Sequence, residues 1–421
     1  MSGKDGLGYR AVTRRHVLTA LGALGAAGLT GVAACSNDKS TWNGPGGAKA
    51  KVSITEPPDG AANVPAGTEI VFKTTDAALT EVTLTDEKGA EVPGAMHPDG
   101  AGWLPKATLD YGASYTATVH VKGNDGKAAT ATSRFTTMAK TDKVVSVVSF
   151  LSDGAVVGVG MPLVFQLSRA VKKARRAAVQ RRLLVTTQPA QEGIWTWYSD
   201  TELHWRPKEF WQSGTKIAVN VRAGGVPMGD GYYGKRDSTL DCSIGPSLIL
   251  SVDDTASPKV MTVTKDGQVV KTIPVSLGRP SMPSSSGTMI IIERLAKTVF
   301  DTMNDPNPAN RYRTDIAYAQ RLTWGGEFIH AAPWSVSDQG KRNVSHGCIN
   351  MSTENAKWLF DQTVVGVPVV TKGTSRQLQW GNGWTDWNKT WDDYVKGSAI
   401  PDTAGNRSRS PAPSASPSHG T

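Results

Sequence analysis

The 421-residue sequence has only three cysteines, Cys35, Cys242 and Cys348. Small secreted scaffolds held together by disulfides use far more cysteine, so this class is excluded. The sequence also lacks the paired Cys/His spacing of zinc fingers, a glycine-rich phosphate-binding loop and the signatures of RNA-binding modules. The formal net charge of +9 therefore gives no reason to expect nucleic acid as a partner.

Long apolar segments are also scarce. One charge-free run, residues 17–34, follows the paired arginines Arg14 and Arg15. It is short, rich in Gly and Ala, and ends in small residues, which is typical of a secretory signal rather than a spanning helix. The arginine pair resembles a twin-arginine export signal. The sequence VAAC, ending at Cys35, resembles a bacterial lipobox, in which that cysteine is lipidated; simple cleavage with Cys35 incidental is the alternative.

Residues 1–35 are therefore expected to be an export signal with a lipobox. Acyl chains on Cys35 would insert into the bilayer through their methylene groups. The predicted location is the outer face of the cytoplasmic membrane, to which the protein would be attached by this lipid anchor. Residues 36–50 are polar and Gly-rich, which predicts a flexible tether.

Apolar and polar residues alternate through most of the remaining chain, which predicts a mainly β protein. Residues 51–140 form short alternating runs separated by turns, and residues 141–245 repeat this pattern. Each segment therefore predicts an immunoglobulin-like β-sandwich. Cys242 alternates with polar neighbours in the second segment, so it is expected to be a buried strand residue. No structural disulfide is expected, because pairing Cys242 with Cys348 would remove a thiol that the sequence marks as reactive.

A basic stretch interrupts the second sandwich. Residues 169–182 contain seven Lys or Arg residues and no acidic residue, and they have the period of a short helix. Two interpretations of this stretch are open. It binds an anionic wall polymer or lipid headgroups, or it is a basic face that is only solvated.

Residues 246–372 predict a third β-rich unit, with a hairpin at Lys265-Asp266-Gly267 and one helix. In that helix Ala356, Leu359, Phe360 and Val364 would share one face. Residues 373–400 repeat tryptophan every three or four positions, which favours packing on a domain over stacking on sugar rings. Residues 401–421 are rich in Pro and Ser and are expected to be disordered.

One short segment concentrates reactive side chains. Ser345-His346-Gly347-Cys348-Ile349-Asn350 places the third cysteine beside a histidine, and His330 lies 18 positions upstream (348 − 330). A cysteine is a nucleophile only as a thiolate, and a neighbouring imidazolium, backbone N–H groups or a helix N-terminus would lower its pKa. Glycine before the cysteine permits a sharp turn that leaves N–H groups free for an oxyanion.

The segment HAAPWSVSDQGKRNVSHGCIN resembles the signature of bacterial L,D-transpeptidases with a YkuD-type catalytic domain. The sequence RYRTDIAY upstream resembles actinobacterial members in particular. The resemblance extends from Cys35 to about Ile400. It implies two immunoglobulin-like domains, then a β-rich catalytic domain with a short Trp-rich C-terminal subdomain.

The resemblance implies a role for each residue of the motif. Cys348 would be the nucleophile and His330 its base and ion-pair partner, held by the backbone carbonyl of Ala331. Ser345 and His346 would shape the loop, which Asn350 would orient by hydrogen bonds. The N–H groups of Gly347 and Cys348, with Tyr312 nearby, would hold the oxyanion. Trp334 would form a wall of the substrate groove. Phe300 would line the pocket, where close relatives have a methionine.

The resemblance also implies the reaction. Cys348 would attack the bond between an L-centred diamino acid and D-alanine in a peptidoglycan stem tetrapeptide, and an amine of a second stem would accept the acyl group, giving a 3→3 cross-link. The implied partners are thus peptidoglycan stem peptides, with carbapenem-type β-lactams as inhibitors. No metal and no cofactor are implied.

Four alternatives remain open from the residues alone. His330, His346 and Cys348 would suit a catalytic zinc with an open position, although the paired short spacings are missing. The same thiol chemistry serves a hydrolase that trims stem peptides with water. The third alternative is a non-catalytic wall-binding lipoprotein, which would need neither a metal ion nor a reactive thiol. The fourth alternative is that the cysteine and histidines only pack a core, which rarely collects so many polar groups.

Overall fold

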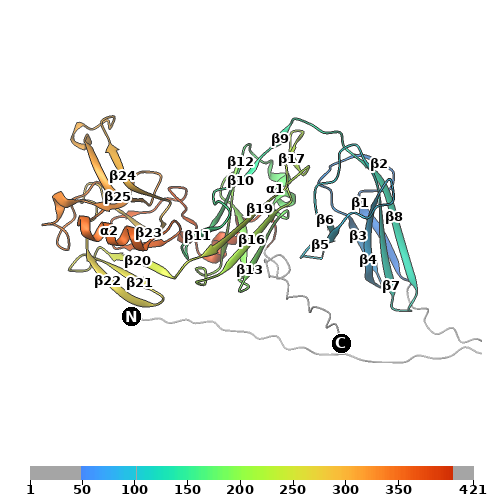
Figure 1. The fold of residues 1–421 in the computed structure, drawn as a ribbon, viewed down its shortest axis with the longest axis horizontal. Coiled ribbons are helices and arrows are strands. Elements are labelled where there is room, and N and C mark those ends of the chain that lie inside the picture. The colour runs from blue at the N-terminus through green and yellow to red at the C-terminus, as the bar shows by residue number, and fades with distance from the viewer. Residues whose placement is uncertain (1–48, 101, 402–421) are drawn as a thin grey trace, which may run out of the picture. The chain divides into compact units, whose positions relative to one another are not determined.

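The computed structural model describes residues 49–401 apart from residue 101. The expected signal with Cys35, most of the expected tether and residues 402–421 lie outside the described residues. Within the described part, no helix is long and apolar enough to cross a lipid bilayer. The described chain is mainly β, as predicted, and its strands fall into three successive groups (Figure 1).

The first group builds a four-stranded sheet, with strand order β2-β8-β7-β4, and two strand pairs, β1-β3 and β5-β6. Strands β7 and β8 form the hairpin around Asp125-Gly126, where Gly126 adopts a φ of 81°. Alternate residues of β7, among them Ala117, Val119 and Val121, are buried, which is the period expected of a half-buried strand. The strands are β1 (Lys51–Glu56), β2 (Ala61–Val64), β3 (Val71–Thr75), β4 (Ala77–Asp86), β5 (Gly94–Met96), β6 (Trp103–Pro105), β7 (Ser114–Gly123) and β8 (Ala128–Thr137).

The second group forms two four-stranded sheets, β10-β12-β15-β14 and β11-β19-β16-β13, and a smaller sheet, β17-β18-β9. The helix expected in the basic stretch is α1 (Lys173–Gln180). The strands are β9 (Val144–Val145), β10 (Val147–Ser149), β11 (Ala155–Val157), β12 (Leu163–Leu167), β13 (Leu183–Gln188), β14 (Gly193–Trp197), β15 (Glu202–Pro207), β16 (Lys216–Val221), β17 (Pro227–Gly229), β18 (Tyr232–Gly234) and β19 (Ser238–Ile244).

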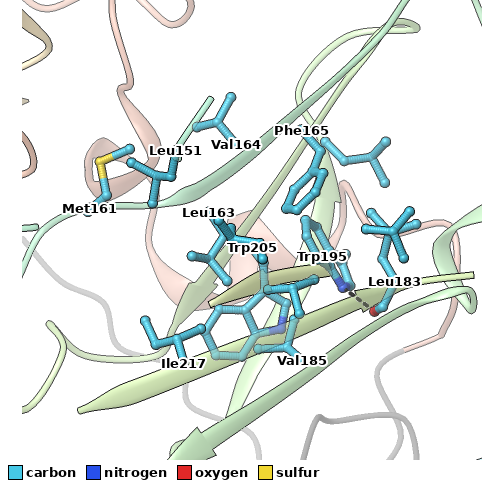
Figure 2. Packing of buried hydrophobic residues seen from close by; sticks show 14 of the residues in the cluster. Leu151, Met161, Leu163, Val164, Phe165, Leu183, Val185, Trp195, Trp205 and Ile217 are labelled. Carbon is cyan, nitrogen blue, oxygen red and sulfur yellow. Dashed lines mark hydrogen bonds between the residues drawn. The ribbon is translucent and has the colours of Figure 1, made fainter. Parts of the chain in front are cut away.

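The core of the second group is built around large aromatic rings. Figure 2 shows Trp195 and Trp205 among the aliphatic side chains, with the indole N–H of Trp195 donating to the carbonyl of Leu183 at 2.8 Å. Cys242 lies buried in β19 as a free thiol, as its alternating pattern predicted. Burial raises the pKa of Cys242 to about 12, so this thiol is protonated at neutral pH.

The third group carries two sheets, a six-stranded β22-β21-β20-β28-β23-β29 and a four-stranded β24-β25-β26-β27. Ser352 is the N-cap of helix α2 (Thr353–Gln362), and its side chain accepts from the N–H of Asn355. The helix buries Ala356 and Leu359 as predicted, but it ends before Val364, which the prediction had placed on the same face. The strands are β20 (Leu248–Asp253), β21 (Val260–Lys265), β22 (Gln268–Pro274), β23 (Ser285–Ile290), β24 (Glu293–Asp301), β25 (Arg313–Arg321), β26 (Phe328–Ala331), β27 (Ile349–Met351), β28 (Pro368–Lys372) and β29 (Arg376–Gln377). The short 3-10 turns are η1 (Pro308–Asn310), η2 (Pro333–Ser335) and η3 (Asp386–Asn388).

The Trp-rich segment contains β29, η3 and helix α3 (Trp391–Val395). Trp384 is fully buried, and Trp387 is partly buried against the core of the second group, which confirms packing for these two residues. Trp380 differs from the prediction, because it is 39% exposed. Its ring contacts Tyr198 at a centroid distance of 4.4 Å and has the ammonium group of Lys389 over it at 3.6 Å.

Candidate active site

The central feature of the site is a pair of parallel strands. Strand β26 pairs with β27 in the register Ile329↔Ile349 and His330↔Asn350. Side chains alternate between the two faces of a sheet, so His330 and Asn350 share one face. Cys348 stands two positions before Asn350 and therefore points to that same face. The parallel pairing thus brings together residues that are 18 positions apart.

That face borders a cavity of about 460 Å³. Eight of the residues singled out from the sequence line it: Phe300, Tyr312, His330, Trp334, Ser345, His346, Cys348 and Asn350. Ala331 lies outside the lining and acts through its backbone, and Gly347 lies in the loop behind Cys348. Arg311 and Asp338, which sequence reasoning did not identify, place one cationic and one anionic side chain at the same cavity.

His330 is 4% exposed, and its Nδ1 lies 2.8 Å from the carbonyl oxygen of Ala331. A carbonyl only accepts hydrogen bonds, so Nδ1 carries the proton and the lone pair is on Nε2. Burial lowers the pKa of His330 to about 4, and the hydrogen bond to Ala331 offsets this only in part. At neutral pH the ring is therefore an uncharged base with Nε2 available.

Cys348 is 8% exposed, and its Sγ–H donates to the carbonyl of Gly326 at 3.7 Å. Burial raises the pKa of the Cys348 thiol to about 12, and the nearby charge of Glu327 acts in the same direction. Both shifts favour the uncharged thiol and the uncharged imidazole. Charge separation would have no solvent to stabilise it in so buried a pair, so both groups stay neutral.

Ser345 shapes the loop that carries Cys348. Its Oγ donates to the carbonyl of Cys348 at 2.6 Å and accepts from the N–H of Gly347 at 3.1 Å. Gly347 has a φ of +120°, a conformation that side-chain-bearing residues rarely adopt, so glycine is required here. The N–H of Gly347 is consequently occupied, and its expected role at an oxyanion is not supported. Within the described part of the chain, the N–H of Cys348 has no hydrogen-bond partner.

Asn350 is buried in the cavity wall. Its Nδ2 donates to the hydroxyl of Ser335 at 3.3 Å, and its backbone exchanges hydrogen bonds with Ser276. Its Oδ1 is buried and has no hydrogen-bond partner among the described residues. Because an unmade hydrogen bond on a buried acceptor costs about 1–3 kcal/mol, this oxygen is suited to a donor from outside the protein.

Aromatic rings surround the two central residues. Phe300 lies edge-on to His330 at a ring distance of 5.2 Å, and Trp334 lies 6.1 Å from it on the open side, 58% exposed. Tyr312 is 5.3 Å from the ring of His346. Burial, together with the charge that Cys348 would carry as a thiolate, raises the pKa of Tyr312. Burial and the charge of Arg279 lower the pKa of His346, so Tyr312 and His346 stay uncharged at neutral pH.

The zinc alternative finds no support in the geometry. Across residues 49–401, no group of three or more His, Cys, Asp or Glu side chains is arranged to hold a metal ion. His330 already uses Nδ1 on a carbonyl, and the Cys348 thiol is directed to Gly326.

Sequence reasoning missed the residues behind the nucleophile. Glu327 is 4% exposed, and its carboxylate accepts hydrogen bonds from Ser285 and from Arg376. One feature of the sequence could have indicated Glu327. It is a single acidic residue that follows two glycines and precedes an apolar strand, in Gly325-Gly326-Glu327-Phe328. A charge in such a position needs a buried partner.

Comparison with known proteins identifies two family matches. The family described as bacterial Ig domain matches residues 61–227. The L,D-transpeptidase catalytic domain, YkuD, matches residues 250–371.

Two proteins of Mycobacterium tuberculosis are similar over most of their length. L,D-transpeptidase 2 is 35% identical over 83% of this chain and 85% of that protein. L,D-transpeptidase 5 is 34% identical over 93% of this chain and 87% of that protein. A solved L,D-transpeptidase in complex with imipenem is 34% identical, with a TM-score of 0.46 over 54% of this chain and 99% of that one. The catalytic-domain match and the two relatives show that this chain belongs to the L,D-transpeptidase family of enzymes.

Proposed function

We propose that Cys348 forms a thioester with the third residue of a peptidoglycan stem tetrapeptide and transfers this acyl group to an amine of a second stem. As Sγ attacks the amide carbon, its proton passes to Nε2 of His330. The imidazolium then protonates the leaving nitrogen, and D-alanine departs. The acceptor amine attacks the thioester, gives its proton to His330 and restores the thiol, so that bonds and protons balance.

The observation that carries this proposal is that Cys348 and His330 line the same cavity, while Nδ1 of His330 is held by a carbonyl and its lone pair is on Nε2. A neutral base beside a neutral thiol is matched to a transfer in which the proton moves during attack. The Ala331 carbonyl fixes the ring tautomer. It also stabilises the imidazolium when it forms, as the third member of a catalytic triad does.

Substrate binding is supported by groups that have no partner inside the protein. The N–H of Cys348 is an oxyanion donor, and the hydroxyl of Tyr312 lines the same cavity. Asn350 Oδ1 would accept from a stem-peptide N–H. Trp334 would cover one side of the bound stem.

The test is the mass of the full chain after incubation with a carbapenem, whose strained amide acylates an active thiol. One drug equivalent on the parent, mapped to the Cys348 peptide, is expected. Cys348→Ala should carry none, and Cys242→Ala should be acylated like the parent. A folded parent that takes up no drug would overturn the thiol mechanism.

Product analysis then separates transfer from trimming. Incubation of the full chain with a donor tetrapeptide and an acceptor amine should give cross-linked peptide and free D-alanine in equal amounts. Free tripeptide in place of cross-linked product would instead establish a hydrolase.

We further propose that Cys35 is lipidated and holds the enzyme at the outer face of the membrane. This rests on the sequence of residues 1–35 and on a substrate that is itself extracellular. Metabolic labelling with an alkyne fatty acid should mark the parent and leave Cys35→Ala unlabelled. Equal labelling of both proteins would reject the anchor.

A further inference from the structure

An ion pair lies behind Cys348, with a buried carboxylate on Glu327 and an Arg376 side chain that is 44% exposed. Oε2 of Glu327 accepts from the N–H of Ser285 at 2.9 Å, and Oε1 accepts from the Ser285 hydroxyl at 2.7 Å. Arg376 completes the site with a charge-assisted hydrogen bond from NH2 to Oε1 of Glu327. A carboxylate this buried is stable only when it is paired and fully hydrogen-bonded, and Glu327 meets both conditions.

Arg376 comes from the C-terminal segment. Strand β29 pairs with β23, with Arg376 opposite Ser285, and Nε of Arg376 donates to the Ser285 hydroxyl at 3.1 Å. The segment that follows the catalytic domain therefore supplies the counter-ion for a group behind Cys348.

Two contacts connect this ion pair to the nucleophile. The carbonyl of Gly326, the residue before Glu327, accepts the Sγ–H of Cys348. The hydroxyl of Ser284, the residue before Ser285, donates to the carbonyl of Gly347 at 2.7 Å. A Cβ on Gly347 would lie 3.6 Å from Cγ of Glu327, so the loop packs directly on this side chain. Movement of Glu327 would displace both the acceptor of the thiol proton and the backbone next to Cys348.

We propose that Glu327 and Arg376 are positioning residues for the transpeptidase reaction. Glu327 fixes the turn and loop that hold Cys348, and Arg376 neutralises its charge so that the developing thiolate is not repelled. This inference rests on the proposed role of Cys348 as nucleophile. It also assigns a function in catalysis to the start of the Trp-rich segment.

The titratable groups around Cys348 define the expected signs. Glu327 lies behind it, His330 is on the adjacent strand, and Tyr312 and His346 are across the cavity, with Arg279 affecting His346. Arg311 and Asp338 line the same cavity and contribute one positive and one negative charge, which all the variants below retain. Glu327 is the anion behind Cys348, and Arg376 is its counter-ion. Removal of the anion should lower the pKa of the thiol, and removal of the cation should raise it. A purely structural role would not produce opposite signs.

The experiment measures alkylation of Cys348 by iodoacetamide against pH in the full chain, with peptides quantified by mass spectrometry. Glu327→Gln should move the profile about one pH unit lower, from a unit charge nearby at an effective dielectric constant of about 20. Because a thiolate of lower pKa is also less nucleophilic, the rate at pH 8 should rise only about threefold. Arg376→Gln should move the profile about one unit higher. The double variant should return toward the parent.

The Cys242 peptide in the same digest reports general loosening of the fold, because it too is buried. Asp253→Asn and Lys372→Gln, which remove a surface ion pair of 3.1 Å in the same domain, are the matched controls and should leave the profile unchanged. In parallel, carbapenem acylation of Glu327→Gln should be at least about tenfold slower than that of the parent despite the more acidic thiol, since the loop is displaced.

Shifts of the same sign in both single variants, or none in Arg376→Gln, would overturn the inference. Alkylation does not require transpeptidation. Suppose that the carbapenem fails to acylate the parent while Glu327→Gln and Arg376→Gln still shift the alkylation profile in opposite directions. In that case the proposed function would be wrong, but the effect of Glu327 and Arg376 on the pKa of Cys348 would stand.

Discussion

Two buried histidines in this protein have opposite surroundings. His204 on β15 is fully buried, with Nδ1 2.9 Å from Asp386 and Nε2 2.7 Å from Glu202. Burial by itself would lower the pKa of His204, but the two carboxylates outweigh it and raise the pKa to about 9. His330 has one carbonyl partner and no carboxylate, and its pKa falls to about 4.

The comparison shows that burial alone does not decide what a histidine does. Both ring nitrogens of His204 donate to carboxylates, so its proton is fixed and the residue is structural. It joins the second sandwich to the Trp-rich segment, where the Tyr394 hydroxyl also donates to Asp386 at 3.1 Å. His330 keeps one nitrogen open toward a cavity, which is the condition for moving a proton.

The largest expected effect is on the nucleophile. Cys348→Ala should lower the transfer rate by about 10³-fold or more, because no other thiol lines the cavity. Cys242→Ala, the other buried free thiol, should retain the parent rate. Release of D-alanine from a tetrapeptide measures both. If Cys348→Ala kept the turnover of the parent, Cys348 would not be the nucleophile.

His330→Gln should lower the acylation rate by about 10²–10⁴-fold while the fold is retained, since glutamine fills the site but cannot take the thiol proton. Single-turnover carbapenem acylation followed by mass spectrometry gives the rate. His120→Gln, at a half-buried histidine of the first sandwich, is the control. Equal rates for His330→Gln and the parent would mean that another base serves Cys348.

Asp386→Asn should destabilise the protein by about 3 kcal/mol, because it removes one charge from a buried pair and leaves the other without its main partner. Urea unfolding at pH 6 measures the change. The exposed Asp392→Asn in α3 should change the free energy of unfolding by less than about 0.5 kcal/mol. Near-equal values for the two variants would show that the His204 pair does not stabilise the fold.

The pH dependence of stability should separate the two histidines further. His204 has a folded pKa above its unfolded value of about 6.5, so its contribution is complete below pH 6.5. It is lost as the pH rises to about 9, a fall of up to about 3 kcal/mol. His330 has a depressed folded pKa, so its contribution is lost as the pH falls from about 6.5 to 4. Urea unfolding from pH 4 to 9 should therefore give a maximum near pH 6.5, and a stability that keeps rising to pH 9 would contradict the assignment of His204.

The smallest effect is expected at the cavity rim. Trp334 is 58% exposed, so Trp334→Ala should leave the melting temperature within about 2 °C of the parent and raise the KM for the donor peptide about three- to fivefold. The equally exposed Trp324→Ala is the matched control. A change in kcat with KM constant would place Trp334 in the chemical step instead.

Several features of the site were predictable because they are local in the sequence. The spacing of Ser345, Gly347 and Cys348 specifies the loop, and the serine hydroxyl does bridge the two backbones of this loop. The Ala331 carbonyl was expected as the partner of His330 and is found there. Helix α2 followed from its apolar period, which places Ala356 and Leu359 on one buried face.

Other features depended on distance through the fold. The use of the Gly347 N–H by Ser345 removed an expected oxyanion donor, and the exposure of Trp380 depends on which neighbours cover it. The pairing of Glu327 with Arg376 joins residues 49 positions apart, which no local pattern indicates.

By itself, the sequence determined that the protein is mainly β and that its candidate reactive residues, Cys348 and His330, lie in one family motif. These properties follow from residue type, alternation and short spacing. Only the tertiary structure decided the protonation states. Burial and the charges brought near by folding make His330 and Cys348 neutral and His204 cationic, and both depend on neighbours that are distant along the chain.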